Sequence, residues 1–174
     1  MLLRHLLSVL LLPFVVVVVV PYALLDGAVG HLELNTASPC LVLRMIIGAA
    51  LLLGGFGFFA WCVRLFASIG RGTLAPWDPT RHLVAVGPYR HVRNPMISGV
   101  ALMLLGEALI SGYKAVGAWV GGVLLINHFY FLLVEEPGLE RRFGEAYRVY
   151  KAHVPRWIPR ARPWTGPVRG TPAA

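Results

Sequence analysis

The residues best suited to chemistry lie in two stretches of the chain, a basic loop and a pair of acids about forty residues further on. The loop sequence GPYRHVRNPM, residues 87–96, carries two arginines and a histidine directly before an apolar segment. The following apolar segment ends in Glu135 and Glu136. A cationic helix start and an anionic helix end at one membrane face would suit a small zwitterionic ligand.

Asn94 and Pro95 predict a helix start, because Asn caps helix N-termini and Pro fits the first helical position. The free N–H groups of that turn, the positive end of the helix dipole and Arg93 together favour a carboxylate. At the other pole, unpaired carbonyls at a helix end and the Glu135 carboxylate favour an ammonium or sulfonium. The short turn 111–114 makes the two helices antiparallel neighbours, so an α-amino acid head group would be held across the pair.

The same charges allow a second interpretation, in which Arg90 or Arg93 neutralises Glu135 or Glu136 in a structural ion pair without a ligand. Arginines beside an apolar segment are also ordinary topology signals. The two glutamates are the stronger sign of function, since ionisable groups are costly near membrane depth. Both interpretations stay open at this point.

His128 lies seven residues before Glu135, at nearly the same angular position two turns deeper in the helix. An ionisable residue at this depth is a candidate substrate contact or base, and a histidine simply hydrogen-bonded within a bundle is the alternative. Glu107, at the far end of its segment, is expected to pair with Lys114 or to meet lipid head groups.

The composition is that of a membrane protein, with 57% hydrophobic and 14% charged residues in 174. The net charge of +8 does not indicate nucleic acid, because the arginines lie beside apolar runs, so a lipid bilayer is the expected partner. Cys40 and Cys62 form no CxxC or His/Cys cluster, so neither a disulfide scaffold nor a metal site is expected.

Four apolar segments predict an all-α bundle of about four transmembrane helices in a single membrane domain, residues 1–174. The loop 68–95 and the tail 135–174 are rich in arginine, whereas the connection 26–39 between the first two spans carries none. This difference predicts that the loop 68–95 and both termini lie in the cytoplasm. The first segment is interpreted as a retained span and not a signal peptide, because its valine run is long and no A-x-A site follows. The expected spans are residues 6–25, 45–67, 96–110 and 115–134.

The tail is expected to start with a break at Pro137 and Gly138, directly after the acids. Apolar residues then recur at helical spacing from Leu139 to Val154, opposite arginines, which predicts a C-terminal amphipathic helix lying on the membrane. Beyond Trp157 the sequence is rich in Pro and Arg without periodicity, which is typical of an interfacial or disordered end.

Two stretches resemble the isoprenylcysteine carboxyl methyltransferase family and its bacterial relatives, whose general plan the phospholipid methyltransferases share. They are HLVAVGPYRHVRNPM, residues 82–96, and EEPGLERRFGEAYRVYKAHVPRWIP, residues 135–159. They are similar to that family's Gly-x-Tyr…Arg-His-Pro loop and its Glu-Glu-x-x-Leu…Phe…Tyr…Tyr…Pro tail. The resemblance implies a multi-pass enzyme of the bacterial inner membrane that uses S-adenosylmethionine, whose amino-acid head group is a zwitterion of the kind described above.

Carried over position by position, the family's cofactor contacts would fall on Arg81, His82, Leu83, Val84, Tyr89, Asn94, Pro95, Met96, Ile97 and Glu135. Charge geometry adds Arg93 and Glu136. In three places the chain departs from the eukaryotic enzymes: Asn94 replaces a histidine, Ile97 a tyrosine, and Phe131 an arginine that receives the substrate carboxylate. A prenylated protein is therefore not the expected substrate.

The expected reaction is methyl transfer to a small lipophilic carboxylate, thiol or amine. An ionised carboxylate needs no base, whereas an amine must arrive neutral and would give its proton to His128 or Glu136, which with Arg93 are the catalytic candidates. The alternatives are phospholipid N-methylation, an NADPH-dependent membrane reductase with a similar Arg-x-Pro loop, and a non-enzymatic scaffold supported only by glycine-rich helices. No metal is required by this chemistry.

Overall fold

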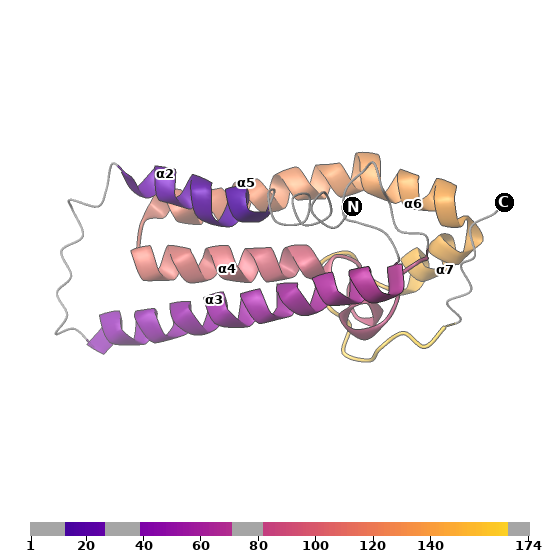
Figure 1. The fold of residues 1–174 in the computed structure, drawn as a ribbon, viewed down its shortest axis with the longest axis horizontal. Helices are drawn as coiled ribbons and strands as arrows, with labels where there is room; N and C mark the ends of the chain where they lie inside the picture. The colour runs from indigo at the N-terminus through magenta and orange to yellow at the C-terminus, as the bar shows by residue number, and fades with distance from the viewer. Residues whose placement is uncertain (1–12, 27–38, 71–81, 167–174) are drawn as a thin grey trace.

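The chain forms an elongated helical bundle, and its computed structural model describes residues 13–26, 39–70 and 82–166. These residues contain no β-strand, so the predicted all-α class is confirmed for the part of the chain that is described. Figure 1 shows the long helices running alternately up and down the bundle. In chain order the elements are η1 (Val15–Val19), α2 (Val20–Asp26), α3 (Pro39–Leu65), η3 (Phe66–Gly70), η4 (Gly87–Arg90), α4 (Pro95–Ser111), α5 (Lys114–Tyr130), η5 (Phe131–Glu135), α6 (Glu136–Phe143) and α7 (Glu145–His153).

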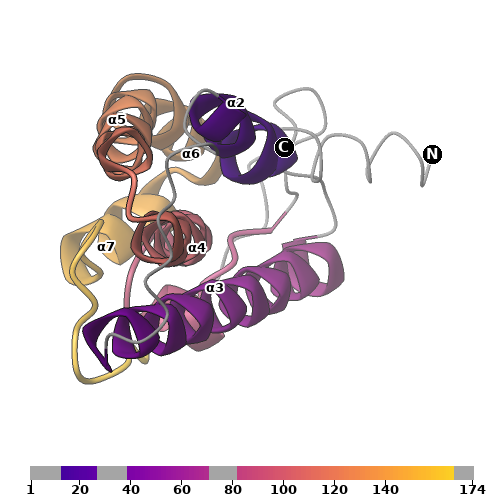
Figure 2. The same cartoon turned by 90° about the vertical axis from the view of Figure 1, so that its left-hand side faces the viewer.

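Helix α4 lies at the centre of the bundle, with α3 along one side and α2 and α5 along the other (Figure 2). The α3–α4 contact is very close because two pairs of glycines face each other. A Cβ added at Gly55 would lie 2.8 Å from the carbonyl oxygen of Gly99, and one added at Gly106 would lie 2.6 Å from that of Gly48. Small residues allow helix backbones to approach this closely in a bilayer. Close packing matters there because lipid tails are as apolar as the side chains, so burying apolar side chains between helices gives no hydrophobic free energy.

Two helical stretches are long and apolar enough to cross a membrane, Pro39–Gly70 and Lys114–Phe143. Their outward faces are strongly apolar, as shown by Leu53 and Leu133, whose side chains are each 68% exposed. The helices Val15–Leu25 and Pro95–Ser111 are apolar but shorter. Residues 6–12 of the first expected span lie outside the described residues.

The predicted helix end at Glu135, with a break at Pro137 and Gly138, is wrong, because the helix continues from α5 through η5 and α6 to Phe143. The backbone at Phe131, Glu135 and Glu136 keeps right-handed helical dihedral angles throughout. Pro137 is tolerated because the preceding turn is a π-turn, which shifts the hydrogen-bond register where proline has no N–H to donate. No helix terminus with unpaired carbonyls therefore lies at Glu135.

The chain reverses after α6 at Gly144, whose φ of +53° is a conformation that favours glycine. The expected single amphipathic segment is thus two short helices, α6 and α7. Residues 154–166, here named the C-terminal strap, then return toward the loop before α4. Trp164 is buried in one apolar cluster with Leu83 and Tyr150. Of the two expectations for this part of the tail, interfacial or disordered, the disordered one is wrong.

Candidate active site

Those sequence-predicted site residues that the structure describes gather at one end of the bundle. Figure 1 shows the segment before α4, the α5–α6 junction, α7 and the C-terminal strap together at this end. The turn between α4 and α5, near Gly112, is at the opposite end. The antiparallel arrangement expected for these two helices is therefore present, and it brings the two charged stretches to the same end.

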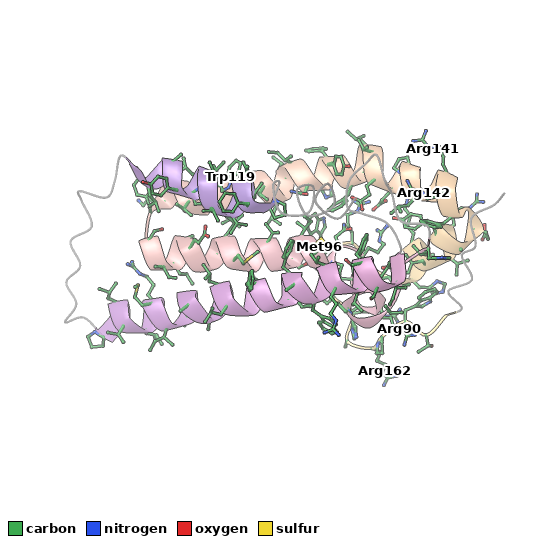
Figure 3. All side chains as sticks on the ribbon, in the orientation of Figure 1. Arg90, Met96, Trp119, Arg141, Arg142 and Arg162 are labelled. Atoms are coloured by element: carbon green, nitrogen blue, oxygen red, sulfur yellow. The ribbon has the colours of Figure 1, made fainter. Side chains whose placement is uncertain are left out.

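Asn94 precedes Pro95 at the start of α4, as the sequence predicts, but its side chain makes no capping hydrogen bond. Its carbonyl oxygen instead accepts bonds from the Ser98 backbone N–H at 3.3 Å and the Ser98 hydroxyl at 3.2 Å. The first N–H groups of the helix have no intrahelical acceptor, so this terminus offers donors. Met96 and Ile97, in the same turn, are half-buried, and Met96 packs between two apolar clusters (Figure 3).

Arg93 and Glu136 form a buried ion pair, with Nη1 donating to Oε1 at 2.9 Å. Glu136 is 3% exposed. It also accepts a hydrogen bond from Arg156 Nε at 2.6 Å and forms an ion pair with Lys151 Nζ at 3.2 Å. A carboxylate facing three cations is held in its ionised form and has little affinity for a further proton. This geometry favours the structural interpretation for Arg93 and Glu136 over that of ligand contact and proton acceptor.

Glu135, the neighbouring acid, is half-buried and makes no hydrogen bond or ion pair with the residues that the structure describes. It lies close enough to Tyr89 to affect its ionisation. Burial raises the pKa of Tyr89 well above its usual value, and Cys62, Tyr150 and Glu135 raise it further. The second acid is therefore the one whose charge is left without a protein partner, beside the loop that precedes α4.

The Tyr89 hydroxyl is buried beside the Cys62 thiol, a weak hydrogen-bonding group, and makes no hydrogen bond of ordinary geometry within the described residues. Its backbone carbonyl accepts the Tyr150 hydroxyl at 2.7 Å. A buried polar atom without a partner is costly unless a ligand satisfies it. Tyr89 and Glu135 thus present an unsatisfied hydroxyl and an unpaired carboxylate at the same end of the bundle.

The remaining loop positions are mostly core residues. Leu83 and Val84 are 7% and 5% exposed, and His82 is half-buried. Arg81 lies outside the described residues. Arg90 Nε donates to the carbonyl oxygen of Ala85 at 3.4 Å, within its own loop.

His128 is hydrogen-bonded to a residue of the C-terminal strap. Trp157 Nε1 donates to His128 Nδ1 at 3.0 Å, and the two rings stack with centroids 6.2 Å apart. Since Nδ1 accepts this bond, the proton of the neutral ring is on Nε2, and the ring has no free acceptor nitrogen for a substrate proton. Phe131 is buried against the same indole, so no cation occupies that position.

The C-terminal strap was missed by sequence reasoning, although it holds the loop in place through its backbone. Three backbone hydrogen bonds join the two segments, Arg93 N–H to Pro155 O at 2.9 Å, Arg160 N–H to His91 O at 3.0 Å, and Trp164 N–H to Arg90 O at 3.0 Å. His91 Nδ1 also contacts the Arg160 carbonyl at 2.8 Å. The spaced tryptophans of this Pro-rich stretch were the one available signal.

Comparison with known proteins adds one family. Residues 43–146 match the phospholipid methyltransferase family, which is well over half of the chain. The chain belongs to that family. The match includes α4, the loop before it and the acids at 135–136, and it agrees with the resemblance carried by the two motifs. No curated protein and no solved structure matches the chain.

The phospholipid methyltransferase family is a family of membrane methyltransferases, so membership supports methyl transfer over the NADPH-dependent reductase and the scaffold. Among the described residues no cluster of His, Cys, Asp or Glu is arranged to hold a metal ion. At the opposite end of the bundle, Glu107 makes no ion pair within the described residues, and its expected pairing with Lys114 is absent.

Proposed function

We propose that this chain transfers a methyl group from S-adenosylmethionine to a small lipophilic carboxylate, thiol or amine at the cytoplasmic face of a bacterial inner membrane. In this proposal residues 1–174 form one domain of four spans with both termini in the cytoplasm. The arginine-rich segments 64–93 and 141–169 support this orientation, because positive residues favour the cytoplasmic side. Helices α6 and α7 then lie along that interface.

The observation that carries the proposal is the unpaired Glu135 carboxylate near Tyr89, whose buried hydroxyl is also unsatisfied. These groups fit a ligand with a cationic end and hydrogen-bonding groups. We assign Glu135 to the ammonium or sulfonium end and the first N–H groups of α4 to the carboxylate. The sequence predicted that helix-end carbonyls and the Glu135 carboxylate would bind the cation together. Because the helix continues past Glu135, the carboxylate is assigned this role alone.

The remaining expected cofactor residues build the walls of this site. Leu83, Val84 and Tyr89 belong to buried clusters, so their backbones hold the loop in one conformation. Met96 and Ile97 offer apolar surface at the start of α4, and Asn94 leaves its side-chain amide free of the helix. Arg81 and His82 stay in the proposal as cofactor contacts.

S-adenosylmethionine, when bound, supplies an electrophilic methyl group, so the protein's task is to position a nucleophile and exclude water. An ionised carboxylate acceptor needs no base. Such an acceptor is favoured because His128 Nδ1 is already bonded to Trp157 and Glu136 is already paired with three cations. In this proposal Arg93 holds the loop before α4 in place through its ion pair with Glu136.

Phospholipid N-methylation is the second candidate, favoured by the family that the chain matches. An amine acceptor must lose a proton, and Glu135 is the acid at this end without a partner among the described residues. The two candidates therefore differ in whether Glu135 only binds the cofactor or also receives a proton.

The test is methyl transfer with cofactor labelled in the methyl group. Purified chain is incubated with bacterial lipid extract and with lipophilic acids, thiols and amines, and labelled products are identified by mass spectrometry. Label in a carboxyl ester or thioether supports the first candidate, and label in a phospholipid head group supports the second. Absence of any labelled product, together with no cofactor binding by calorimetry, would overturn both.

A further inference from the structure

A hollow on the outer surface of the bundle is separate from the site described above. It has a volume of about 510 Å³ and is lined by Leu133, Pro137, Glu140, Arg141 and Arg148. Neither Glu135 nor Tyr89 lines it. Figure 3 shows Arg141 extending from α6 away from the bundle, so the hollow faces outward.

The charges around this hollow leave a positive excess. Glu140 pairs with Lys151, whose Nζ lies 2.7 Å from its Oε1 and is shared with Glu136. Arg148 pairs with Glu145 at 3.1 Å, but both side chains are well exposed, and such a pair is weak and easily exchanged. Arg141 makes no ion pair with any residue that the structure describes. Arg141 and Arg148 are thus two guanidinium groups available to an anion.

The hollow also adjoins apolar surface on the second candidate membrane-crossing helix. Leu132, Leu133 and Val134, at the edge of the hollow, are 44%, 68% and 53% exposed. Phe129, one turn earlier in the helix, is 50% exposed. This strip faces hydrocarbon if the helix spans the bilayer, and the arginines follow it at the point where the charged residues begin. An acyl chain beside the strip and a phosphate beside the arginines belong to one molecule, a phospholipid.

We propose that Leu133, Pro137, Arg141 and Arg148 form a binding site for an anionic phospholipid of the surrounding bilayer. Its phosphate is received by the two guanidinium groups, which match phosphate oxygens in geometry and charge. Its acyl chain lies along the apolar strip that includes Leu133. The site rests on α5 spanning the membrane and not on methyl transfer, so it holds whatever the methyl acceptor is.

The test uses the full chain in lipid nanodiscs of phosphatidylcholine containing a tenth part of phosphatidylglycerol. Native mass spectrometry then measures how many phosphatidylglycerol molecules stay bound when the protein is released. The double variant Arg141→Gln/Arg148→Gln should lose most of this retention. The expected drop in phosphatidylglycerol affinity is about fivefold for each arginine removed. A matched double variant, Arg64→Gln/Arg162→Gln, removes the same charge from exposed positions away from the hollow, and Figure 3 shows Arg162 on the opposite side from Arg141.

Retention in the control and loss in the double variant supports the site. Equal retention in the two variants, or equal loss, shows that the lipid is held elsewhere or by overall charge, and either result overturns the proposal. The thermal midpoint of each variant in phosphatidylcholine alone checks that both are folded. Glycerol phosphate added to detergent-purified protein separates a lipid site from a phosphate site, because stabilisation equal to that by phosphatidylglycerol would contradict a lipid occupant.

Discussion

Arg93 Nη1 lies 2.9 Å from Glu136 Oε1, and this contact joins the segment before α4 to the first turn of α6. Both side chains are nearly buried, and Arg156 of the C-terminal strap adds a second guanidinium to the same oxygen at 2.6 Å. Three segments far apart in sequence are therefore fixed by one carboxylate. Because Glu136 is used in this way, its neighbour Glu135 is the acid that remains without an ion pair among the described residues.

Glu136→Gln should strongly destabilise the protein. It removes the charge that compensates buried Arg93 and partly buried Arg156, and breaking a buried pair on one side costs about 3–5 kcal/mol. The unfolding midpoint in detergent measures this change. Glu145→Gln is the control, because its ion pair with Arg148 is exposed and contributes about 0–1 kcal/mol. Similar midpoints for the two variants would show that the buried carboxylate does not hold the segments together.

Gly55→Ala and Gly106→Ala should each lower stability by about 1–3 kcal/mol, because the added methyl group meets backbone atoms of the facing helix. Gly54→Ala and Gly57→Ala lie on the same helix as Gly55, and an added Cβ there has no atom within 4 Å among the described residues. These two should be neutral or slightly stabilising, since Ala favours helix over Gly. If all four variants behave alike, the α3–α4 contact is not glycine-dependent.

His128→Gln should reduce the methyl-transfer rate less than tenfold. The histidine accepts a hydrogen bond from Trp157, and the glutamine side chain also offers an acceptor for the indole. Loss of a general base costs about 10²–10⁴-fold in rate. A reduction of a hundredfold or more, with the unfolding midpoint unchanged, would restore His128 as a catalytic base.

Stability should fall at high pH through Tyr147. Burial raises the pKa of Tyr147 to about 12 in the folded protein, Glu136 adds to the shift and Arg93 opposes it. The folded state therefore favours the protonated phenol. The stability that Tyr147 contributes is fully present below its pKa in the unfolded chain, about 10, and is lost as the pH rises toward 12. Midpoints measured from pH 8 to 12 should fall less in Tyr147→Phe than in the unchanged protein. Tyr113→Phe, at an exposed position, should follow the unchanged protein, and identical slopes in all three would contradict the assignment.

Helix α4 shows how far the sequence could predict the fold. It was expected at residues 96–110 and spans Pro95–Ser111, because Pro95 starts it and Gly112, with a φ of +66°, ends it. The repeated glycines also indicated close packing. Their pairing, Gly55 with Gly99 and Gly48 with Gly106, depends on the register between two helices, which one chain read alone does not give.

The end of α5 shows where local reasoning was insufficient. Pro137 and Gly138 are strong helix breakers, yet the π-turn before them keeps the helix intact to Phe143. Residues such as Trp157 and Trp164 were likewise beyond prediction, because their positions depend on long-range hydrogen bonds of an aperiodic segment. The sequence indicated that both acids mattered, but only the contacts distinguish paired Glu136 from unpaired Glu135.

The most direct test of the proposed site is calorimetric titration of S-adenosylmethionine into purified protein carrying Glu135→Gln, with Glu107→Gln as the matched control. Both changes remove one glutamate charge from a helix of the bundle, and Glu107 lies at the opposite end. We predict that affinity falls tenfold or more for Glu135→Gln and changes less than twofold for Glu107→Gln. Equal affinities in the two variants would contradict a cofactor site at the Glu135 end of the bundle.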